Sequence, residues 1–175
     1  MKKHSFGSFA QPASGSFKSL SKAKRSDPIG ERSSPHSKAL KRLSDNPEKA
    51  KGNREHFVQV ALFDRMFRDY PEIYKRMAAI PNGVYCHKRT AQSMVEEGLK
   101  KGYPDITLDA PRGAYHGMKL ELKVGNNKLS SHQRAWLDQL NADGYYAVCV
   151  YGLEAAVNAF VRYWFLAPKE RMAND

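Results

Sequence analysis

The chain has 175 residues, a net charge of +11 and two cysteines. This length favours one domain with a tail, and so few cysteines exclude a small secreted scaffold held together by disulfides. No apolar run approaches the length of a membrane span, and the basic N-terminus lacks the apolar core of a signal peptide. We therefore expect a cytoplasmic protein with no membrane partner.

The positive charge is concentrated at the N-terminus. Residues 1–54 contain 13 Lys/Arg and 4 Asp/Glu, a balance of +9, whereas the remainder has a balance of +2. Residues 1–52 are rich in Ser, Lys and Pro and poor in branched aliphatics, which predicts a disordered, basic, low-complexity tail. We expect one or two transient helical turns at 37–43. Such an arm favours a polyanionic partner, and the alternative is a tail that only improves solubility.

A first helix is predicted from Asn53, a good N-cap residue, to Asp69. Four side chains recur on one face at helical spacing: Glu55, Gln59, Leu62 and Met66. The first two extend an apolar stripe toward the interior, where an unpaired charge is costly. A nearby metal site would explain Glu55. The alternative is a glutamate that interacts favourably with the helix dipole.

Shorter elements are predicted next. A proline at a first helical position indicates a second short helix at 71–79, and the Pro-Asn-Gly sequence at 81–83 indicates a turn. A short strand at 84–86 is then followed by a helix at 90–101, which Gly102 closes as the glycine beyond its C-terminus.

The segments 105–108 and 118–124 both alternate apolar and polar residues, and a polar loop with a proline and two glycines separates them. This pattern predicts an antiparallel hairpin. Because side chains alternate faces along a strand, Glu121 and Lys123 share the face opposite the apolar residues. A turn near the middle of the loop places Asp105 opposite Glu121, at a Cβ separation of about 4.5–5.5 Å.

Two carboxylates and a lysine that meet at one point predict a hydrolytic site. Carboxylates this close repel unless a cation lies between them, and oxygen ligands suit Mg²⁺ or Mn²⁺. Such an ion lowers the pKa of a bound water and neutralises charge on a phosphoryl oxygen. Lys123 is on the same face and can orient that water or contact the scissile phosphate. The alternative is a half-exposed hairpin with ordinary surface charges.

The rest of the chain predicts a loop at 125–128, a helix from the N-cap Ser130 to Asp143, and a strand at 145–151 that is buried on both faces. A last, unusually apolar helix follows at Leu153–Trp164. The strand-helix-strand order predicts a parallel crossover. The whole succession fits an α/β fold around a small mixed sheet.

Charged and polar residues also flank the predicted hairpin. Gln133 falls in the first turn of the helix after the second strand, where it points back at Glu121 and Lys123. Four cations are candidates for contacts with a nucleic-acid backbone: Lys128, Arg134, Lys100 and Lys101. The alternative for each is a solvated charge, or for the last two a favourable interaction with a helix C-terminus.

The residues of the hairpin resemble the catalytic core of the PD-(D/E)xK nuclease superfamily: Pro104, Asp105, Glu121, Leu122 and Lys123. Further motifs resemble its VRR-NUC branch: Glu55 with Gln59, then residues 80–83, then Leu129, Ser130 and Gln133. The resemblance spans residues 53–163. Tyr103 departs from the small residue that is more often found before the proline.

The resemblance implies roles for individual residues. Glu55, Asp105, Glu121 and the main-chain carbonyl of Leu122 would bind the metal. The lysine, Lys123, would be catalytic together with the two acids of the hairpin. Gln133 would support the same site. The implied fold is a restriction-endonuclease-like α/β sandwich, with a tail at 1–52, a nuclease domain at 53–167 and a C-terminal tail at 168–175.

The resulting hypothesis is a Mg²⁺- or Mn²⁺-dependent DNA endonuclease. Small stand-alone members of the family resemble junction-cleaving enzymes of viral replication and repair, so we expect a phage-type protein of the host cytoplasm that cuts Holliday junctions or other branched DNA. A homodimer would supply two nicks, with Leu153–Trp164 as a possible contact. The alternatives are a sequence-specific restriction-type endonuclease and a non-catalytic DNA-binding protein.

Overall fold

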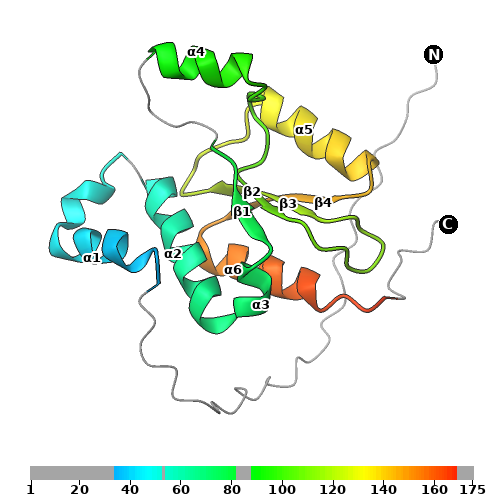
Figure 1. The fold of residues 1–175 in the computed structure, drawn as a ribbon, viewed down its shortest axis with the longest axis horizontal. Coiled ribbons are helices and arrows are strands. Elements are labelled where there is room, and N and C mark those ends of the chain that lie inside the picture. The colour runs from blue at the N-terminus through cyan, green and yellow to red at the C-terminus, as the bar shows by residue number, and fades with distance from the viewer. Residues whose placement is uncertain (1–33, 53, 82–87, 169–175) are drawn as a thin grey trace. The chain divides into compact units, whose positions relative to one another are not determined.

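The computed structural model describes residues 34–52, 54–81 and 88–168, and the fold is given for these ranges. The helices are α1 (Ser37–Asp45), α2 (Arg54–Asp69), α3 (Pro71–Tyr74), α4 (Lys88–Glu96), α5 (Ser131–Ala142) and α6 (Leu153–Trp164), with a 3₁₀ helix η1 (Pro47–Ala50) (Figure 1). The strands are β1 (Met77–Ala79), β2 (Ile106–Leu108), β3 (Met118–Lys123) and β4 (Tyr146–Tyr151). Among the described helices, none is long and apolar enough to cross a membrane.

The four strands form one mixed sheet in the order β1-β2-β3-β4. β2 pairs antiparallel with both β1 and β3, whereas β3 and β4 run parallel. The β2–β3 hairpin and the β3–α5–β4 crossover that the sequence predicts are both confirmed. β3 is therefore a central strand with a hydrogen-bonded neighbour on each side, and all six of its residues are buried.

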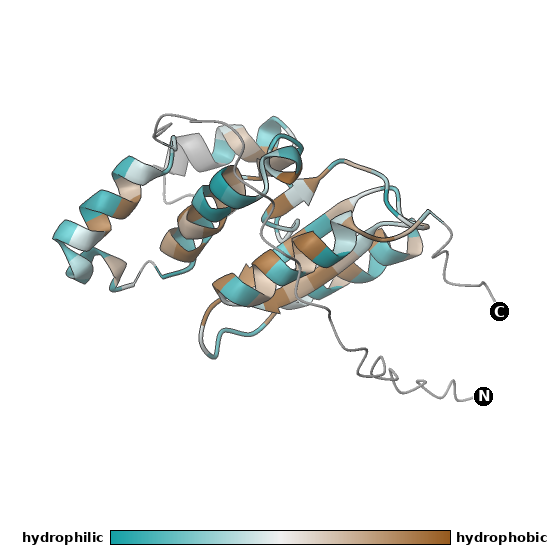
Figure 2. Ribbon diagram, turned by 90° about the horizontal axis from the view of Figure 1, so that it is seen from below, coloured by the Kyte–Doolittle hydropathy of each residue, from teal (hydrophilic) through white to brown (hydrophobic). Residues whose placement is uncertain are grey.

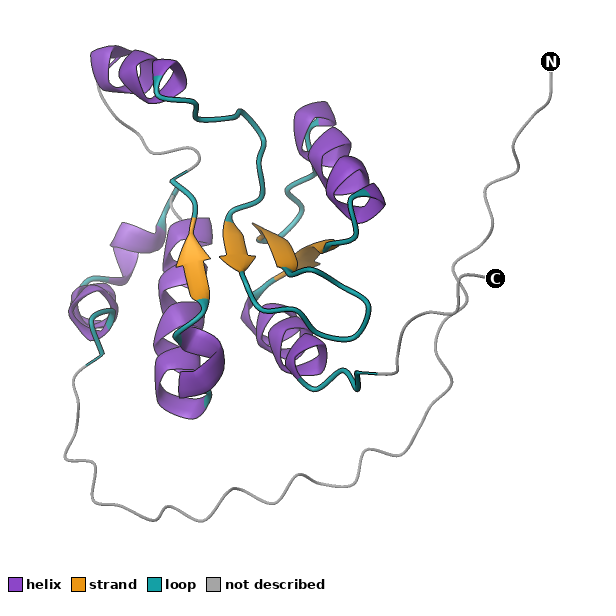
Figure 3. Ribbon diagram, turned by 45° about the vertical axis from the view of Figure 1, so that its right-hand side comes forward, coloured by secondary structure: helices purple, strands orange, loops and turns teal. Residues whose placement is uncertain are grey.

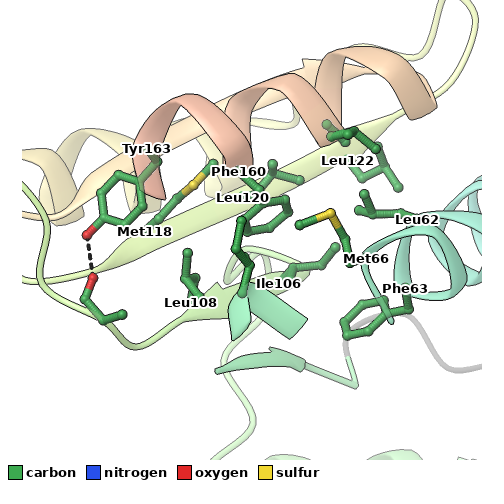
Figure 4. Close-up of a cluster of buried hydrophobic side chains, with 14 residues drawn as sticks. Leu62, Phe63, Met66, Ile106, Leu108, Met118, Leu120, Leu122, Phe160 and Tyr163 are labelled. Carbon is green, nitrogen blue, oxygen red and sulfur yellow. Dashed lines mark hydrogen bonds between the residues drawn. The ribbon is translucent and has the colours of Figure 1, made fainter. Parts of the chain in front are cut away.

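Helices cover both faces of the sheet. Figure 3 shows α5 on one side, and α6 together with α2 on the other. The main core lies on the α2/α6 side, where Leu62 and Met66 of α2 and Phe160 of α6 contact the apolar face of β3 (Figure 4). A smaller apolar cluster lies under α5 and contains Leu137, Leu140 and Ala147. The fold is a mixed α/β structure, as predicted.

A buried tyrosine fixes the end of α6 against the hairpin loop. The hydroxyl of Tyr163 donates a hydrogen bond of 2.7 Å to the carbonyl oxygen of Ala110 (Figure 4). Burial raises the pKa of this hydroxyl to about 12, so it remains a donor at neutral pH. The hairpin loop also contacts α6 through Arg112, whose guanidinium lies 3.7 Å from the centroid of the Trp164 ring.

The prediction of a mostly disordered segment at 1–52 is wrong for its last part. Residues 37–45 form the helix α1, which packs against α2. The anchor precedes the helix: the ring nitrogen Nε2 of His36 lies 3.0 Å from the hydroxyl of Tyr74, and Ser34 is buried. Hydrophilic residues dominate α1 (Figure 2), so composition alone concealed a helix that tertiary contacts stabilise.

Two predicted helices are shorter than expected. The segment 71–79 is helical only to Tyr74, and Met77–Ala79 forms β1 because the backbone of β2 offers it an edge. The helix expected at 90–101 ends at Glu96, and Gly98 adopts a φ of 103°, which breaks the helix before Gly102. The strand expected at 84–86 and the N-cap Asn53 lie outside the described residues.

The strand β4 is only partly buried on its two faces, whereas the prediction was that both are buried. It forms an edge of the sheet, and Ala147 is its one buried residue. The continuous apolar run reflects partial burial under α5 and α6, and Tyr151 at its end is 51% exposed. An apolar run therefore does not distinguish a central strand from an edge strand that lies between two helices.

Candidate active site

The central position of β3 determines where its charged side chains lie. Glu121 and Lys123 project from the face that α5 covers, opposite the main core. Their exposed fractions are 1% and 7%. Burial of this kind is costly for a charge unless it is paired, so each of these side chains must find a partner within the site.

Asp105 approaches from the neighbouring strand. The register pairs Ile106 with Leu120, so the next residue pair outward is Asp105 and Glu121, as the sequence predicts. One carboxylate oxygen of Asp105 accepts a hydrogen bond of 3.0 Å from the main-chain N–H of Leu122. Its own carbonyl oxygen accepts from the N–H of Ile80 at 2.8 Å. Asp105 is thus held between β1 and β3.

Glu121 receives two donors on the same oxygen. The ammonium of Lys123 lies 2.7 Å from Oε1 of Glu121, and the side-chain amide of Gln133 donates to that oxygen as well. Gln133 can reach it because α5 begins with a capping box. The main-chain N–H of Ser130 donates to the amide oxygen of Gln133 at 2.9 Å, which orients the NH₂ group toward Glu121.

Glu55 completes the group from the first turn of α2. Its Oε1 lies 3.8 Å from the ammonium of Lys123 and accepts a hydrogen bond of 2.9 Å from the side-chain amide of Asn127. The Glu55 side chain remains 41% exposed, so it lies at the rim of the site. Asn127 is a residue that the sequence reasoning missed. Its signal was its position in the loop directly after β3.

The electrostatics follow from burial and from the close carboxylates. Burial, together with the nearby charges of Asp105 and Glu55, raises the pKa of Glu121 to about 7 in spite of Lys123. Burial also raises the pKa of Asp105, although the N–H of Leu122 opposes the change. Burial alone would lower the pKa of Lys123, but its contacts with the carboxylates outweigh this and raise it.

Comparison with known proteins agrees with this arrangement. The sequence model of the VRR-NUC domain matches residues 36–153. The chain belongs to the VRR-NUC domain family. A solved structure described as a VRR_NUC domain protein has 27% sequence identity and a TM-score of 0.57, over 65% of this chain and 89% of that one. No protein of curated function matches.

Membership of the VRR-NUC family identifies the protein as a nuclease-domain protein. The matched region begins at residue 36 and therefore includes α1, which the sequence reasoning had placed in the tail. The four residues of the hairpin and α5 that were predicted to act together, Asp105, Glu121, Lys123 and Gln133, are brought into one group by the fold. Their catalytic roles remain predictions.

The donor set of this VRR-NUC site fits a divalent cation. Oε2 of Glu121 is buried and has no hydrogen-bond partner in the part of the chain that the structure describes. An orphaned carboxylate oxygen beside a second desolvated carboxylate is a suitable pair of ligands for a hard ion such as Mg²⁺ or Mn²⁺. Within the described ranges, no group of three or more His, Cys, Asp or Glu side chains forms a complete metal site. The remaining ligands would be main-chain, water or phosphate oxygens.

The predicted phosphate-binding cations lie around the N-terminus of α5. Lys128 and Arg134 are exposed in the preceding loop and in the first turn of the helix. The turn with Lys100 and Lys101 reaches the same place, because the indole N–H of Trp136 donates to the carbonyl of Lys101 at 3.2 Å. None of the four forms an ion pair with another described residue, so each is available to an anion.

Proposed function

We propose that this VRR-NUC protein is an endonuclease that hydrolyses DNA phosphodiester bonds with Mg²⁺ or Mn²⁺. One observation carries the proposal: two desolvated carboxylates, Asp105 and Glu121, lie beside a lysine at one end of β3, and one buried oxygen of Glu121 has no described partner. Oδ1 of Asp64 in α2 is also buried without a described partner, so the orphaned oxygen of Glu121 supports a metal site because a second desolvated carboxylate, Asp105, lies beside it. The exposed cations around the N-terminus of α5 suit a polyanionic substrate.

In this proposal, different side chains bind the metal ion, take part in catalysis and position Glu121. Glu55, Asp105, Glu121 and the carbonyl of Leu122 would bind the ion, which supplies an activated water and neutralises charge on the phosphate. Lys123 has its ammonium at the same point and serves the attacking water or the scissile phosphate. Gln133 donates to one oxygen of Glu121, and the other oxygen, which has no partner among the described residues, is left for the ion.

We also place the domain in the PD-(D/E)xK superfamily, with a restriction-endonuclease-like sandwich. The support is the order of the acids and the lysine on an antiparallel hairpin. A parallel β3–α5–β4 crossover follows this hairpin. The phage origin and the cytoplasmic location stay predictions from the sequence. The helices on both faces of a small mixed sheet are consistent with the sandwich.

Branched DNA and a homodimer remain part of the proposal, but the dimer contact changes. Phe160 is fully buried in the core and Arg112 covers Trp164, so the predicted face of α6 is occupied within the chain. Large apolar side chains are instead exposed at Phe165, 66%, and Tyr151, 51%. Two sites related by a two-fold axis would nick opposing strands of a junction.

A single assay tests the proposed function. Labelled linear, flap and four-way-junction DNA are incubated with the full chain, with and without Mg²⁺ or Mn²⁺. Metal-dependent cleavage of the junction supports the proposal, and cutting of linear DNA at fixed sequences would indicate a restriction-type enzyme instead. Binding without any cleavage would make it a non-catalytic DNA-binding protein. Sedimentation of the protein and a Phe165→Glu variant tests the dimer.

A further inference from the structure

Two groups of cations before β1 differ in their partners. Those of the α2–α3 region are engaged locally: Arg65 pairs with Asp69, Arg68 with Asp64, and Lys75 and Arg76 with Glu72. The segment from α1 to the start of α2 is different. It has six exposed cations that form no ion pair with any described residue: Lys38, Lys41, Arg42, Lys49, Lys51 and Arg54. We call these six side chains the α1–η1 surface.

The α1 part of this surface presents its charges on one side of a helix that packs against α2. Lys38, Lys41 and Arg42 follow the i, i+3, i+4 spacing of a helix, so they share one face. The less exposed Leu40 and Leu43 lie on the other side, consistent with packing of α1 against α2. The contact between His36 and Tyr74 fixes the start of the helix. The positive charges are therefore presented in a defined place, unlike charges on a flexible arm.

A short segment of chain connects the α1–η1 surface to Glu55 of the candidate active site. Four residues lie between Ala50, the end of η1, and Glu55, and the five Cα–Cα steps between these two residues span at most about 18 Å. Lys51 and Arg54 lie within this connection. Two of the six cations are therefore close in the chain to Glu55 at the rim of the candidate active site.

The composition of the surface indicates what it binds. Residues 37–52 contain five Lys/Arg and no Phe, Tyr or Trp, so this segment has no aromatic side chain on which an unpaired base could stack. Two acids, Asp45 and Glu48, interrupt the positive charge without cancelling it. Recognition by charge alone suits the regular phosphate backbone of a duplex.

We propose that the α1–η1 surface docks a duplex arm of the DNA substrate and holds it against the active site. This inference rests on the proposed function and adds where the substrate is bound. It assigns to a folded helix a role that the sequence reasoning gave to the basic tail as a whole. Binding at α1 would contact phosphates only, so it would be independent of base sequence.

The test uses the full chain and a labelled duplex in EDTA, where no cleavage occurs. Binding is measured by fluorescence anisotropy over a range of KCl concentrations. The triple variant Lys38→Gln, Lys41→Gln, Arg42→Gln should reduce the slope of log K against log[salt] by about 2.7, because each phosphate contact contributes about 0.9 on duplex DNA. Glutamine preserves helix propensity, and an unchanged melting temperature shows that α1 is intact.

A matched control removes the same charge elsewhere: Arg65→Gln, Lys75→Gln and Arg162→Gln, all outside the α1–η1 surface. This variant should keep the wild-type slope. An unchanged slope in the α1 variant, or an equal loss in both variants, would overturn the docking proposal. The proposed function is scored separately, by metal-dependent cleavage at saturating enzyme. If the α1 variant had a reduced salt slope but the wild type cleaved no DNA, the docking proposal would stand and the proposed nuclease function would be refuted.

Discussion

The side-chain amide of Asn127 donates a hydrogen bond of 2.9 Å to Oε1 of Glu55, across 72 positions of the chain. This bond joins the loop after β3 to the first turn of α2. It holds Glu55 where the same oxygen also lies 3.8 Å from the ammonium of Lys123. Asn127 therefore positions Glu55 at the rim of the site, and in the proposed function it would influence the metal only through Glu55.

The first prediction concerns this bond. Asn127→Ala should raise the Mg²⁺ concentration for half-maximal cleavage by about tenfold, because residues that orient a metal ligand typically contribute 10–100-fold to metal affinity. Turnover at saturating Mg²⁺ should change less. Titration calorimetry with Mn²⁺ in the absence of DNA measures the same loss directly.

The neighbouring Asn126 provides the control. It is exposed in the same loop and its side chain forms no hydrogen bond with the described residues. Asn126→Ala should leave the Mn²⁺ affinity unchanged. Equal effects of the two substitutions would mean that loop composition, and not the contact with Glu55, determines the affinity.

The second prediction concerns the catalytic group. Asp105→Asn, Glu121→Gln and Lys123→Met should each lower the cleavage rate by about 10²–10³-fold, as expected when a group that stabilises the transition state is removed. Binding of DNA in EDTA should persist. Asp109→Asn serves as a control, because Asp109 lies on the same strand face but contacts Thr107 and Lys119 instead. Wild-type cleavage by Glu121→Gln would refute the assignment.

The third prediction separates the two roles of Gln133. Gln133→Glu retains a residue that suits a capping box, so the stability of α5 should be largely preserved. The new carboxylate cannot donate to Glu121 and repels it, so cleavage should fall. Ser130→Ala does the opposite: it removes the cap, at a cost of about 1 kcal/mol, and leaves the amide in place.

Thermal unfolding and cleavage rates together measure this separation. We expect Gln133→Glu to lose activity with little change in melting temperature, and Ser130→Ala to lose melting temperature with more of its activity retained. If both variants lost activity only in proportion to their stability, Gln133 would have a purely structural role.

The fourth prediction concerns the metal. Cleavage should require Mg²⁺ or Mn²⁺ and disappear in EDTA. Ca²⁺ should bind the oxygen ligands but support little turnover, because its coordination shell is larger and looser. Added Mn²⁺ should also raise the melting temperature of the wild type by satisfying the buried carboxylates, and this rise should be smaller in Glu121→Gln. Full activity in EDTA would exclude the metal mechanism.

The fifth prediction concerns stability and pH at the neighbouring cluster. Burial disfavours the ionised form of Asp109, but hydrogen bonds from Thr107 and Lys119 outweigh this and lower its pKa below the ordinary 3.8. Its contribution to stability is therefore present above the unfolded pKa and is lost as the pH falls through the folded value. Asp109→Asn should lower the melting temperature at pH 7, and the difference from wild type should shrink in strong acid.

The control for this prediction is Asp138→Asn, a substitution of an exposed aspartate of α5 that forms no ion pair with a described residue. Its melting temperature should follow that of the wild type at both pH values. A deficit in Asp109→Asn that stayed constant down to strongly acidic pH would show that the side-chain bonds, and not the charge, stabilise the hairpin.

Local patterns in the sequence were sufficient for the strands that carry the site and for the helix that follows them. The alternation in β3 assigns Glu121 to one face and Leu120 to the other, because successive side chains in a strand point in opposite directions. The serine and glutamine of the capping box similarly identify the start of α5. These features depend on residues that are close together in the chain, so they can be predicted without knowledge of the tertiary structure.

Contacts between distant segments determined the features that the sequence did not predict. β1 forms where a helix was predicted, because β2 has a free edge. α1 is ordered because His36 and Ser34 are held against the domain, although its composition is that of a tail. Asn127 and Glu55 are 72 positions apart, so the place of Asn127 in the loop after β3 did not by itself predict its partner. Sequence determined the chemistry of the candidate site through local periodicity, whereas tertiary packing decided which distant side chains orient it, because hydrogen bonds between segments form only once the core has brought them together.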